Sequence, residues 1–212
     1  MADSTTAALA APTPLLDHLS SRGKSQAAQM LKQRGYLLSK NDNMAFDAYI
    51  SFGKDGKDLE GESTDDGHKK WIAVRGIDFG ASLPIKRSRS DGGADTVDRP
   101  HFETFFFTKD LDKATPNLLK ACATGQKFDT VTLDLCVMLA NAKKPYLTVT
   151  YEKVYVTSLS SVAAADDDSI PTELVGLSFG KIKITYQPVD LVKAALGGKV
   201  EAEFDLGALT YK

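Results

Sequence analysis

Cysteine and histidine are scarce in this chain of 212 residues, which contains two cysteines and three histidines. Cys122 and Cys136 form no CxxC pair, and no histidine stands at metal-ligand spacing beside either of them. A chain of this length can bury enough apolar surface to fold without disulfide bonds. The scarcity therefore excludes a disulfide scaffold, and we expect neither a metal site nor a cofactor.

Long apolar runs and an excess of charge of either sign are also missing. No stretch approaches the roughly 18 apolar residues of a membrane-spanning helix, and the formal net charge is −2. We therefore expect no membrane insertion and no nucleic-acid partner. The first residues lack a basic segment, and Pro12 and Pro14 interrupt the Ala-rich stretch, so we expect no signal peptide and a chain that starts in the cytoplasm.

Two regions differ in composition and pattern. Residues 1–43 are rich in Ala, Ser and Thr, with two prolines followed by a candidate helix around residues 15–38. We interpret them as an N-terminal extension that is weakly ordered or partly helical. Residues 44–212 have the pattern of one folded domain.

From residue 44 onward, apolar and polar residues alternate with a period of two, which is typical of half-buried β-strands. The clearest rows are Phe46 to Phe52, Val131 to Val137, Leu147 to Tyr151, and Val200 to Leu206. The apolar set changes parity after Tyr151 and again across Gly180, which predicts a bulge or bend at each place. Short breaks rich in Gly, Asp and Ser separate the rows, as expected between antiparallel strands.

One segment has the pattern of a helix. Thr115 is a candidate N-cap, Pro116 suits the first turn, and Gly125 suits the residue after the last turn. Leu118, Leu119 and Cys122 form the predicted apolar stripe. The predicted fold is therefore mainly β, an antiparallel β barrel or sandwich with one packed α-helix at about residues 115–124.

The sequence Gly176-Leu177-Ser178-Phe179-Gly180 fits the nucleophile elbow of serine hydrolases. That chemistry requires a helix after the serine, and an acid and a histidine further along the chain. Residues 181–186 alternate like a strand instead, and all three histidines precede Ser178. We therefore interpret the two glycines as a bend between strands and expect no enzyme activity, and a Ser178 hydrolase ranks last among the alternatives.

A basic patch lies in a long loop from Ser82 to about Pro100. It contains Lys86, Arg87 and Arg89, and Asp98 follows within the same loop. No aromatic residues interleave with the basic ones, which argues against nucleic-acid binding. Because a loop of this length in a compact domain usually has a binding role, we predict a subunit interface at Lys86, Arg87, Arg89 and Asp98.

From residue 44 the chain resembles the haemolysin-coregulated protein (Hcp) family, the inner-tube subunits of bacterial type VI secretion systems. The resemblance rests on the order of several segments: Met44 to Ile50, Gly61 to Ser63, Trp71 to Val74, Phe107 to Leu119, Pro171 to Glu173, Phe179 to Tyr186, and Gly198 to Ala202. Family members usually begin at the position of Met44, so residues 1–43 are a real extension, a fused tag or effector remnant, or the result of a start codon assigned too far upstream. Initiation at Met44 is the simplest account.

The resemblance implies a barrel with the helix on its side, six copies in a ring, and rings stacked into a hollow, secreted tube. It implies a spike protein and a contractile sheath as partners, and small effector proteins as cargo in the lumen. It also implies that Asp78 lines the lumen and touches cargo. The alternative is a monomeric β barrel that binds a small ligand in its interior.

Overall fold

The computed structural model describes residues 47–86, 95–139, 142–162, 170–190 and 192–211. The predicted N-terminal extension, residues 1–43, lies outside the described residues, as do the first residues of the predicted opening strand. The elements in chain order are β1 (Asp47–Ser51), β2 (Ile72–Val74), β3 (Gly76–Asp78), β4 (Ala81–Ser82), β5 (Ile85–Lys86), β6 (Thr96–Val97), β7 (His101–Phe102), β8 (Phe105–Asp110), α3 (Thr115–Thr124), β9 (Lys127–Leu139), β10 (Ala142–Val162), β11 (Thr172–Ser178), β12 (Lys181–Tyr186), β13 (Val189–Asp190), β14 (Ala195–Leu196), β15 (Val200–Asp205) and β16 (Thr210–Tyr211).

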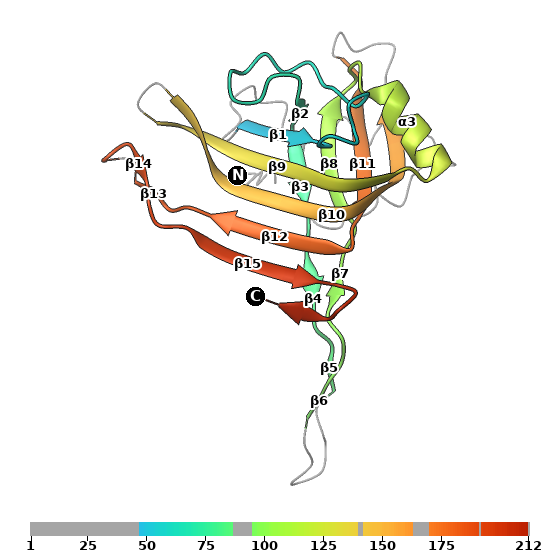
Figure 1. The fold of residues 1–212 in the computed structure, drawn as a ribbon, viewed down its shortest axis with the longest axis vertical. Helices are drawn as coiled ribbons and strands as arrows, with labels where there is room; N and C mark the ends of the chain where they lie inside the picture. Colours follow the sequence, from blue (N-terminus) through green and yellow to red (C-terminus); the bar gives the residue numbers. More distant parts are fainter. Residues whose placement is uncertain (1–46, 87–94, 140–141, 163–169, 191, 212) are drawn as a thin grey trace, which may run out of the picture.

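Ten of these strands form one antiparallel sheet that folds around the core. Its main order is β16-β15-β12-β10-β11-β8-β3, and β9, β1 and β2 continue from β10 in that order. Figure 1 shows β9, β10, β12 and β15 running across the molecule, with β3, β8 and β11 nearly perpendicular behind them. The described residues contain one helix, α3, and the arrangement confirms the predicted mainly β fold.

Strand β10 joins the two halves because it bends within its length. Its first part pairs with β12, from Leu147 to Glu152, and its second part pairs with β11, from Tyr155 onward. Lys153 at the bend has φ 55°, in the left-handed region, and the buried side chains change parity from Tyr151 to Val154 around it. The change of parity in the sequence therefore corresponds to a bend of β10 at Lys153.

The second predicted bend, at Gly180, lies against the first. The backbone N–H of Gly180 donates to the Glu152 carbonyl at 2.9 Å, and its carbonyl accepts from Leu206 at 3.0 Å. A Cβ at position 180 would meet the Lys153 side chain at 3.0 Å, so glycine permits the close approach. The two bends together form the corner at which the sheet turns around the core.

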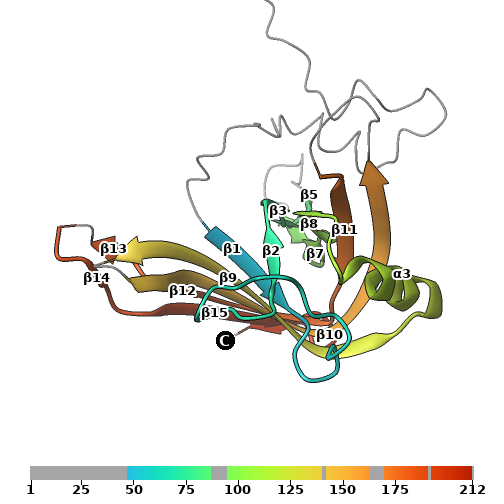
Figure 2. The same ribbon diagram turned by 90° about the horizontal axis from the view of Figure 1, so that it is seen from above.

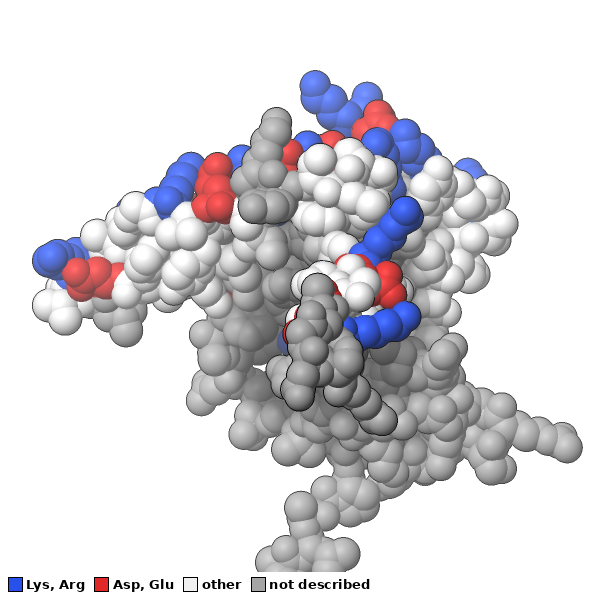
Figure 3. Space-filling view, turned by 90° about the horizontal axis from the view of Figure 1, so that it is seen from below, with Lys and Arg blue, Asp and Glu red and all other residues white. Residues whose placement is uncertain are grey.

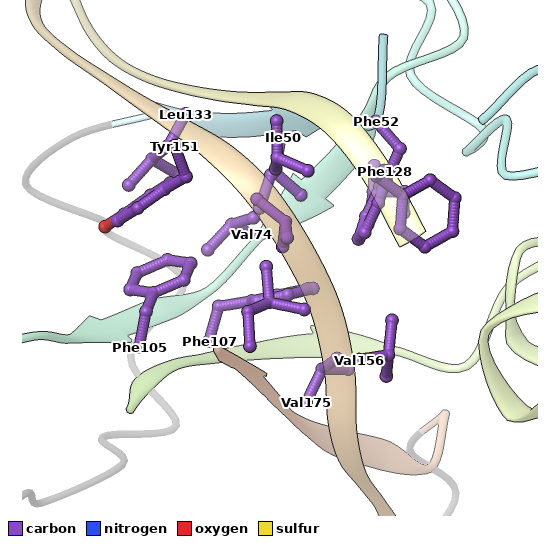
Figure 4. Close-up of a cluster of buried hydrophobic side chains, with 14 of the residues drawn as sticks. Ile50, Phe52, Val74, Phe105, Phe107, Phe128, Leu133, Tyr151, Val156 and Val175 are labelled. Atoms are coloured by element: carbon purple, nitrogen blue, oxygen red, sulfur yellow. The ribbon is translucent and has the colours of Figure 1, made fainter. Parts of the chain in front are cut away.

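The core consists of apolar side chains from both halves of the sheet. Figure 4 shows them converging from β1, β2, β8, β9, β10 and β11. The Tyr151 ring lies 4.8 Å from Phe105 and 4.9 Å from Phe179, measured between ring centroids. Ten core residues labelled in Figure 4 are Ile50, Phe52, Val74, Phe105, Phe107, Phe128, Leu133, Tyr151, Val156 and Val175. The alternation in the sequence therefore marked the buried face of these strands correctly.

Helix α3 covers residues 115–124 as predicted, but two details of the prediction were wrong. Ala114, not Thr115, is the N-cap residue, and no side chain caps it. Leu119 is 57% exposed, whereas Leu118 and Ala121 are fully buried. Residues 118, 121 and 122 share one helical face and Leu119 lies about 100° around from Leu118, so it points to solvent. Gly125 ends the helix at φ 64° as expected.

A buried ion pair fixes the start of α3 on the sheet. Lys109 Nζ lies 2.7 Å from Glu173 Oε2, and both side chains have no exposed surface. Thr115 donates its hydroxyl to Glu173 Oε2 at 2.6 Å, and Ser161 donates to Oε1 at 2.7 Å. Burial opposes ionisation of Glu173, but these hydrogen bonds outweigh it and lower its pKa. Thr115 therefore attaches the start of α3 to the sheet through Glu173, and it does not cap the helix as predicted.

Two elements project from the barrel. The ribbon, residues 81–86 and 95–102, extends away through the pairs β4–β7 and β5–β6 (Figure 1). The arm comprises residues 135–139, 142–148, 185–190 and 192–202 and carries the β13–β14 pair at its end. Figure 2 shows the arm pointing away from α3. No helix among the described residues has the length and apolarity needed to cross a membrane.

Candidate assembly surfaces

The surroundings of Ser178 do not match a nucleophile elbow. Strand β11 ends at Ser178, and strand β12 begins at Lys181, so no helix follows the serine. Across the described ranges, no cluster of three or more His, Cys, Asp or Glu side chains could hold a metal ion. The candidate functional sites are therefore exposed surfaces. Most of the exposed large apolar side chains lie on the two projections.

The ribbon was predicted as a long loop from Ser82 to about Pro100, but its described residues form two short strand pairs. Ile85 pairs with Val97, and Lys86 pairs with Thr96, across the β5–β6 ladder. Ile85 is 55% exposed, Val97 59% and Leu83 48%. Exposed large apolar side chains gathered on a two-stranded ribbon are typical of a surface that another protein covers.

The predicted interface residues fall on this ribbon where they are described. Lys86 is exposed at the end of β5, and Asp98 is exposed next to β6. The Asp98 backbone N–H donates to the Pro84 carbonyl at 3.0 Å, so the two sides of the ribbon stay in register there. Arg87 and Arg89 lie outside the described residues. An interface role for all four remains a prediction.

The arm carries a row of apolar side chains that leaves the core. Leu147 pairs with Tyr186, which pairs with Val200, so the three lie side by side across β10, β12 and β15. Tyr186 is 43% exposed and Val200 is 63% exposed. On the same face nearer the barrel, Tyr151 and Ile182 are buried. One continuous apolar face therefore passes from the core to the molecular surface.

The opposite face of the same strands is charged. Lys181 Nζ lies 2.9 Å from Glu203 and 3.3 Å from Glu152, and Lys183 lies 3.1 Å from Glu201. Hydrogen bonding to Glu203 raises the pKa of Lys181, and hydrogen bonding from Lys183 lowers the pKa of Glu201. Viewed from below, charged side chains of both signs gather along one margin of the arm, and its flank is largely uncharged (Figure 3).

Asp78, the predicted cargo contact, lies on β3. It pairs with Phe106 of β8 at the edge of the main sheet and is 8% exposed. Thr108, two residues further along β8, is also buried. A role for Asp78 in the lumen remains a prediction.

Comparison with known proteins gives a consistent result. The family described as "Type VI secretion system effector, Hcp" matches residues 49–186. Protein hcp1 of Pseudomonas aeruginosa is 32% identical over 158 residues, which is 74% of this chain and 93% of that protein.

Solved structures show the same similarity. A structure of a type six secretion system protein has a TM-score of 0.72 and 29% identity, covering 79% of this chain and all of the other. The crystal structure of Hcp1 from Salmonella typhimurium has a TM-score of 0.61 and 28% identity, covering 80% of this chain and all of the other. The match therefore extends over the whole length of both of these proteins.

Sequence reasoning missed the apolar character of the ribbon and the exposure of the arm. For the ribbon, a signal existed in Leu83, Ile85 and Val97, but the adjacent basic residues drew the interpretation toward charge. For the arm, no local signal existed. Val200 and Phe204 hold equivalent positions in the same alternating pattern, although Val200 is exposed and Phe204 is partly buried.

Proposed function

The chain belongs to the Hcp family of type VI secretion proteins, and we propose that it is a structural subunit of the inner tube, closing as hexameric rings that stack into a hollow tube. The observation that carries this proposal is the pair of exposed apolar surfaces on the arm and the ribbon. The arm and the ribbon are different elements that project in different directions (Figure 1), so one copy offers two distinct exposed apolar regions to its neighbours.

Two distinct surfaces suit a head-to-tail interface. Such an interface joins one patch on a subunit to a different patch on the next, and it closes into a ring when the rotation allows. Covering Tyr186 and Val200 would remove apolar area from water at about 25 cal/mol for each Å². We assign these arm residues to the contact within a ring.

The ribbon is assigned to the contact between rings. Its length carries it beyond the barrel, and its described residues combine apolar Ile85 and Val97 with charged Lys86 and Asp98. An interface with a larger polar share is expected to be weaker than an apolar one of equal area. Stacking contacts weaker than ring contacts would let a tube be taken apart into intact rings.

The same proposal covers cargo, partners and route. Small effector proteins travel in the lumen, with Asp78 among the residues that they touch. A spike protein and a contractile sheath contact the end and the outside of the tube. The subunit is made in the bacterial cytoplasm and leaves through the type VI system.

The proposal includes no catalysis. Ser178 is the last residue of β11, strand β12 follows from Lys181, and all three histidines precede Ser178 in the chain. The alternative of a monomeric ligand-binding barrel ranks second, because large buried side chains such as Phe107 and Tyr151 lie in the interior where such a ligand would bind (Figure 4).

Charge substitutions on the two projections test the proposal. Val200→Asp places a carboxylate in the arm contact and should convert rings to monomers. Ile85→Asp should leave rings intact but prevent their stacking. Light scattering and negative-stain images of the purified variants measure both effects.

Leu119→Asp is the matched control, because Leu119 is an exposed apolar residue of α3 outside both projections. It should leave rings and stacks unchanged. Rings that survive Val200→Asp, or that are lost equally with Leu119→Asp, would contradict the assignment of the arm.

We also propose that residues 44–212 fold without residues 1–43. The buried core from Ala48 to Ile182 supports this proposal, because it joins the strands of the main sheet and α3 in one cluster. A variant lacking residues 1–43 should remain soluble and unfold cooperatively in urea. An insoluble or unfolded product would contradict this division of the chain.

A further inference from the structure

A second cluster of side chains lies on the face of the sheet opposite the core. Tyr49 of β1 and Asp134 of β9 alternate with the core residues Ile50 and Leu133, so they point outward. The segment that covers them is residues 61–71 of the β1–β2 connection, which we call the latch loop. Gly61 donates its N–H to the Lys70 carbonyl at 2.8 Å, and Lys70 donates to Ser63 at 2.9 Å. The latch loop is therefore an ordered hairpin that lies on the sheet.

His68 is the buried anchor of the latch loop. It is 5% exposed, and its ring stacks on Tyr49 with centroids 4.5 Å apart and planes 9° apart. The Trp71 ring meets it edge-on at 4.9 Å. A histidine enclosed by two aromatic rings has few positions open to it, so its two ring nitrogens have fixed partners.

Both ring nitrogens of His68 face carboxylates. Nδ1 lies 2.8 Å from Asp65 Oδ1, and Nε2 lies 3.1 Å from Asp134 Oδ2. A neutral imidazole has one N–H, whereas the imidazolium has two. Only the imidazolium can donate to both carboxylates, and a neutral ring would leave one nitrogen lone pair facing an anionic oxygen.

The other charged groups around His68 are also predominantly acidic. Lys143 of β10 lies 3.0 Å from Asp65 and 3.0 Å from Asp47 of β1, so one ammonium is shared by two carboxylates. With Asp134, three carboxylates surround one lysine and the imidazole. The hydrogen bond from His68 is the largest cause that lowers the pKa of Asp65.

The remaining titratable neighbours stay neutral near neutral pH. Burial raises the pKa of Cys136, whose Sγ is 3.8 Å from His68 Nε2, to about 12. Burial likewise raises the pKa of Tyr49, although Lys143 donates to its hydroxyl. Neither group therefore adds a negative charge to the cluster, and neither can supply a positive one.

We propose that His68 is a protonation-dependent latch that holds the latch loop on the outer face of β1 and β9. With the imidazolium present, the loop is joined to β9 through Asp134 and to its own turn through Asp65. Raising the pH removes one N–H and the positive charge, so the loop is held more weakly on the alkaline side, where the Lys143–Asp65 pair remains. Because the pKa of Asp65 is lowered, its carboxylate stays ionised until the pH falls through that lowered pKa. The interaction between Asp65 and His68 is therefore lost only in acid.

Hydrogen exchange and NMR of the full-length protein test the latch from about pH 5 to about pH 9, the range that spans the titration of an imidazole. After correction for intrinsic rates, the amides of Ser63, Lys70 and Trp71 should exchange about tenfold faster or more at the alkaline end, as expected for losing a hydrogen bond to a charged group. The core amides of β8 should not change. Nitrogen-15 spectra should show protons on both His68 ring nitrogens while the loop is protected.

Two variants and a control separate the latch from general effects of pH. His68→Gln and Asp134→Asn should each make the latch loop exchange fast at all pH values. His101→Gln is the control, because His101 is exposed on the ribbon, and it should behave like the wild type. A single protonated nitrogen on His68 in the protected state, or an unchanged pH response in His68→Gln, would overturn the proposal. The wild-type spectra decide the question even if a variant fails to fold.

Discussion

The barrel and the arm are built from the same strands, but the apolar face is buried in the barrel and partly exposed on the arm. At the barrel end, Val131, Tyr151 and Ile182 lie in one cross-strand row and are buried. At the arm end, Leu135, Leu147, Tyr186 and Val200 form the corresponding row, and its outer members are exposed. Burial within the chain stabilises the fold, whereas the exposed apolar row of the arm is the surface that we propose contacts a neighbouring copy. Substitutions at the two ends should therefore affect different measurements.

The largest effect is expected from shortening a core side chain. Phe107 has no exposed surface, so Phe107→Ala should lower the free energy of unfolding by about 4 kcal/mol. Tyr186→Ala removes a similar ring from the arm, where Tyr186 is 43% exposed, and should cost less than about 1 kcal/mol. Urea unfolding measures both in the Val200→Asp background, so that loss of the proposed ring contact at Tyr186 does not add to the result. Equal losses would show that the arm is part of the folding core.

The second effect concerns the buried ion pair. Lys109→Met leaves Glu173 without its cation in a buried site and should cost about 3 kcal/mol at neutral pH. Since the pKa of Glu173 is lowered, its contribution is present above the ordinary carboxyl pKa and is lost as the pH falls through the lowered value. The loss of stability caused by Lys109→Met should therefore be smaller in acid. The double variant Lys109→Met with Glu173→Leu should recover part of the stability, since Asp112, 2.8 Å from Lys109 Nζ, still loses its cation; failure to recover any would contradict this account.

The third effect concerns two glycines that differ in the space available for a side chain, one in the latch loop and one in the arm. A Cβ on Gly61 would collide with backbone atoms of Trp71 and Ile72, whereas a Cβ on Gly198 has no atom within 4 Å. Gly61→Ala should cost about 2 kcal/mol because backbone must move. Gly198→Ala should change stability by less than about 1 kcal/mol. Thermal unfolding of the two variants provides the comparison.

The smallest effect is expected on the charged face of the arm. Lys183 and Glu201 form an ion pair in which both side chains are about half exposed, at 40% and 45%. Lys183→Met should leave the unfolding midpoint within experimental error, because water and salt screen an exposed pair. A clear loss of stability would mean that this face is more enclosed than its exposure indicates.

Much of the barrel could be predicted from the sequence, because alternation reports the faces of a strand. The rows beginning at Val131 and Leu147, the parity change after Tyr151 and the helix ending at Gly125 all follow from local pattern. The exposure of Val200 could not be predicted, since alternation does not say where the covering layer ends. Its pattern is the same as that of a buried strand.

The candidate functional surfaces were predicted less completely. The subunit-interface hypothesis placed attention on Lys86 and Asp98, which do lie on the ribbon, but not on the apolar pair Ile85 and Val97. The tertiary role of Thr115 and the partners of His68 were also beyond local pattern. His68 and Asp134 are 66 positions apart, and only the fold brings them together.

The solution mass of the wild-type chain, measured by light scattering with negative-stain images of the same peak, tests the central claim most directly. The account predicts six times the mass of one chain and rings with a central hole. A monomer that persists at high protein concentration would contradict it, and would show that the apolar rows of the arm and ribbon are not contacts between copies.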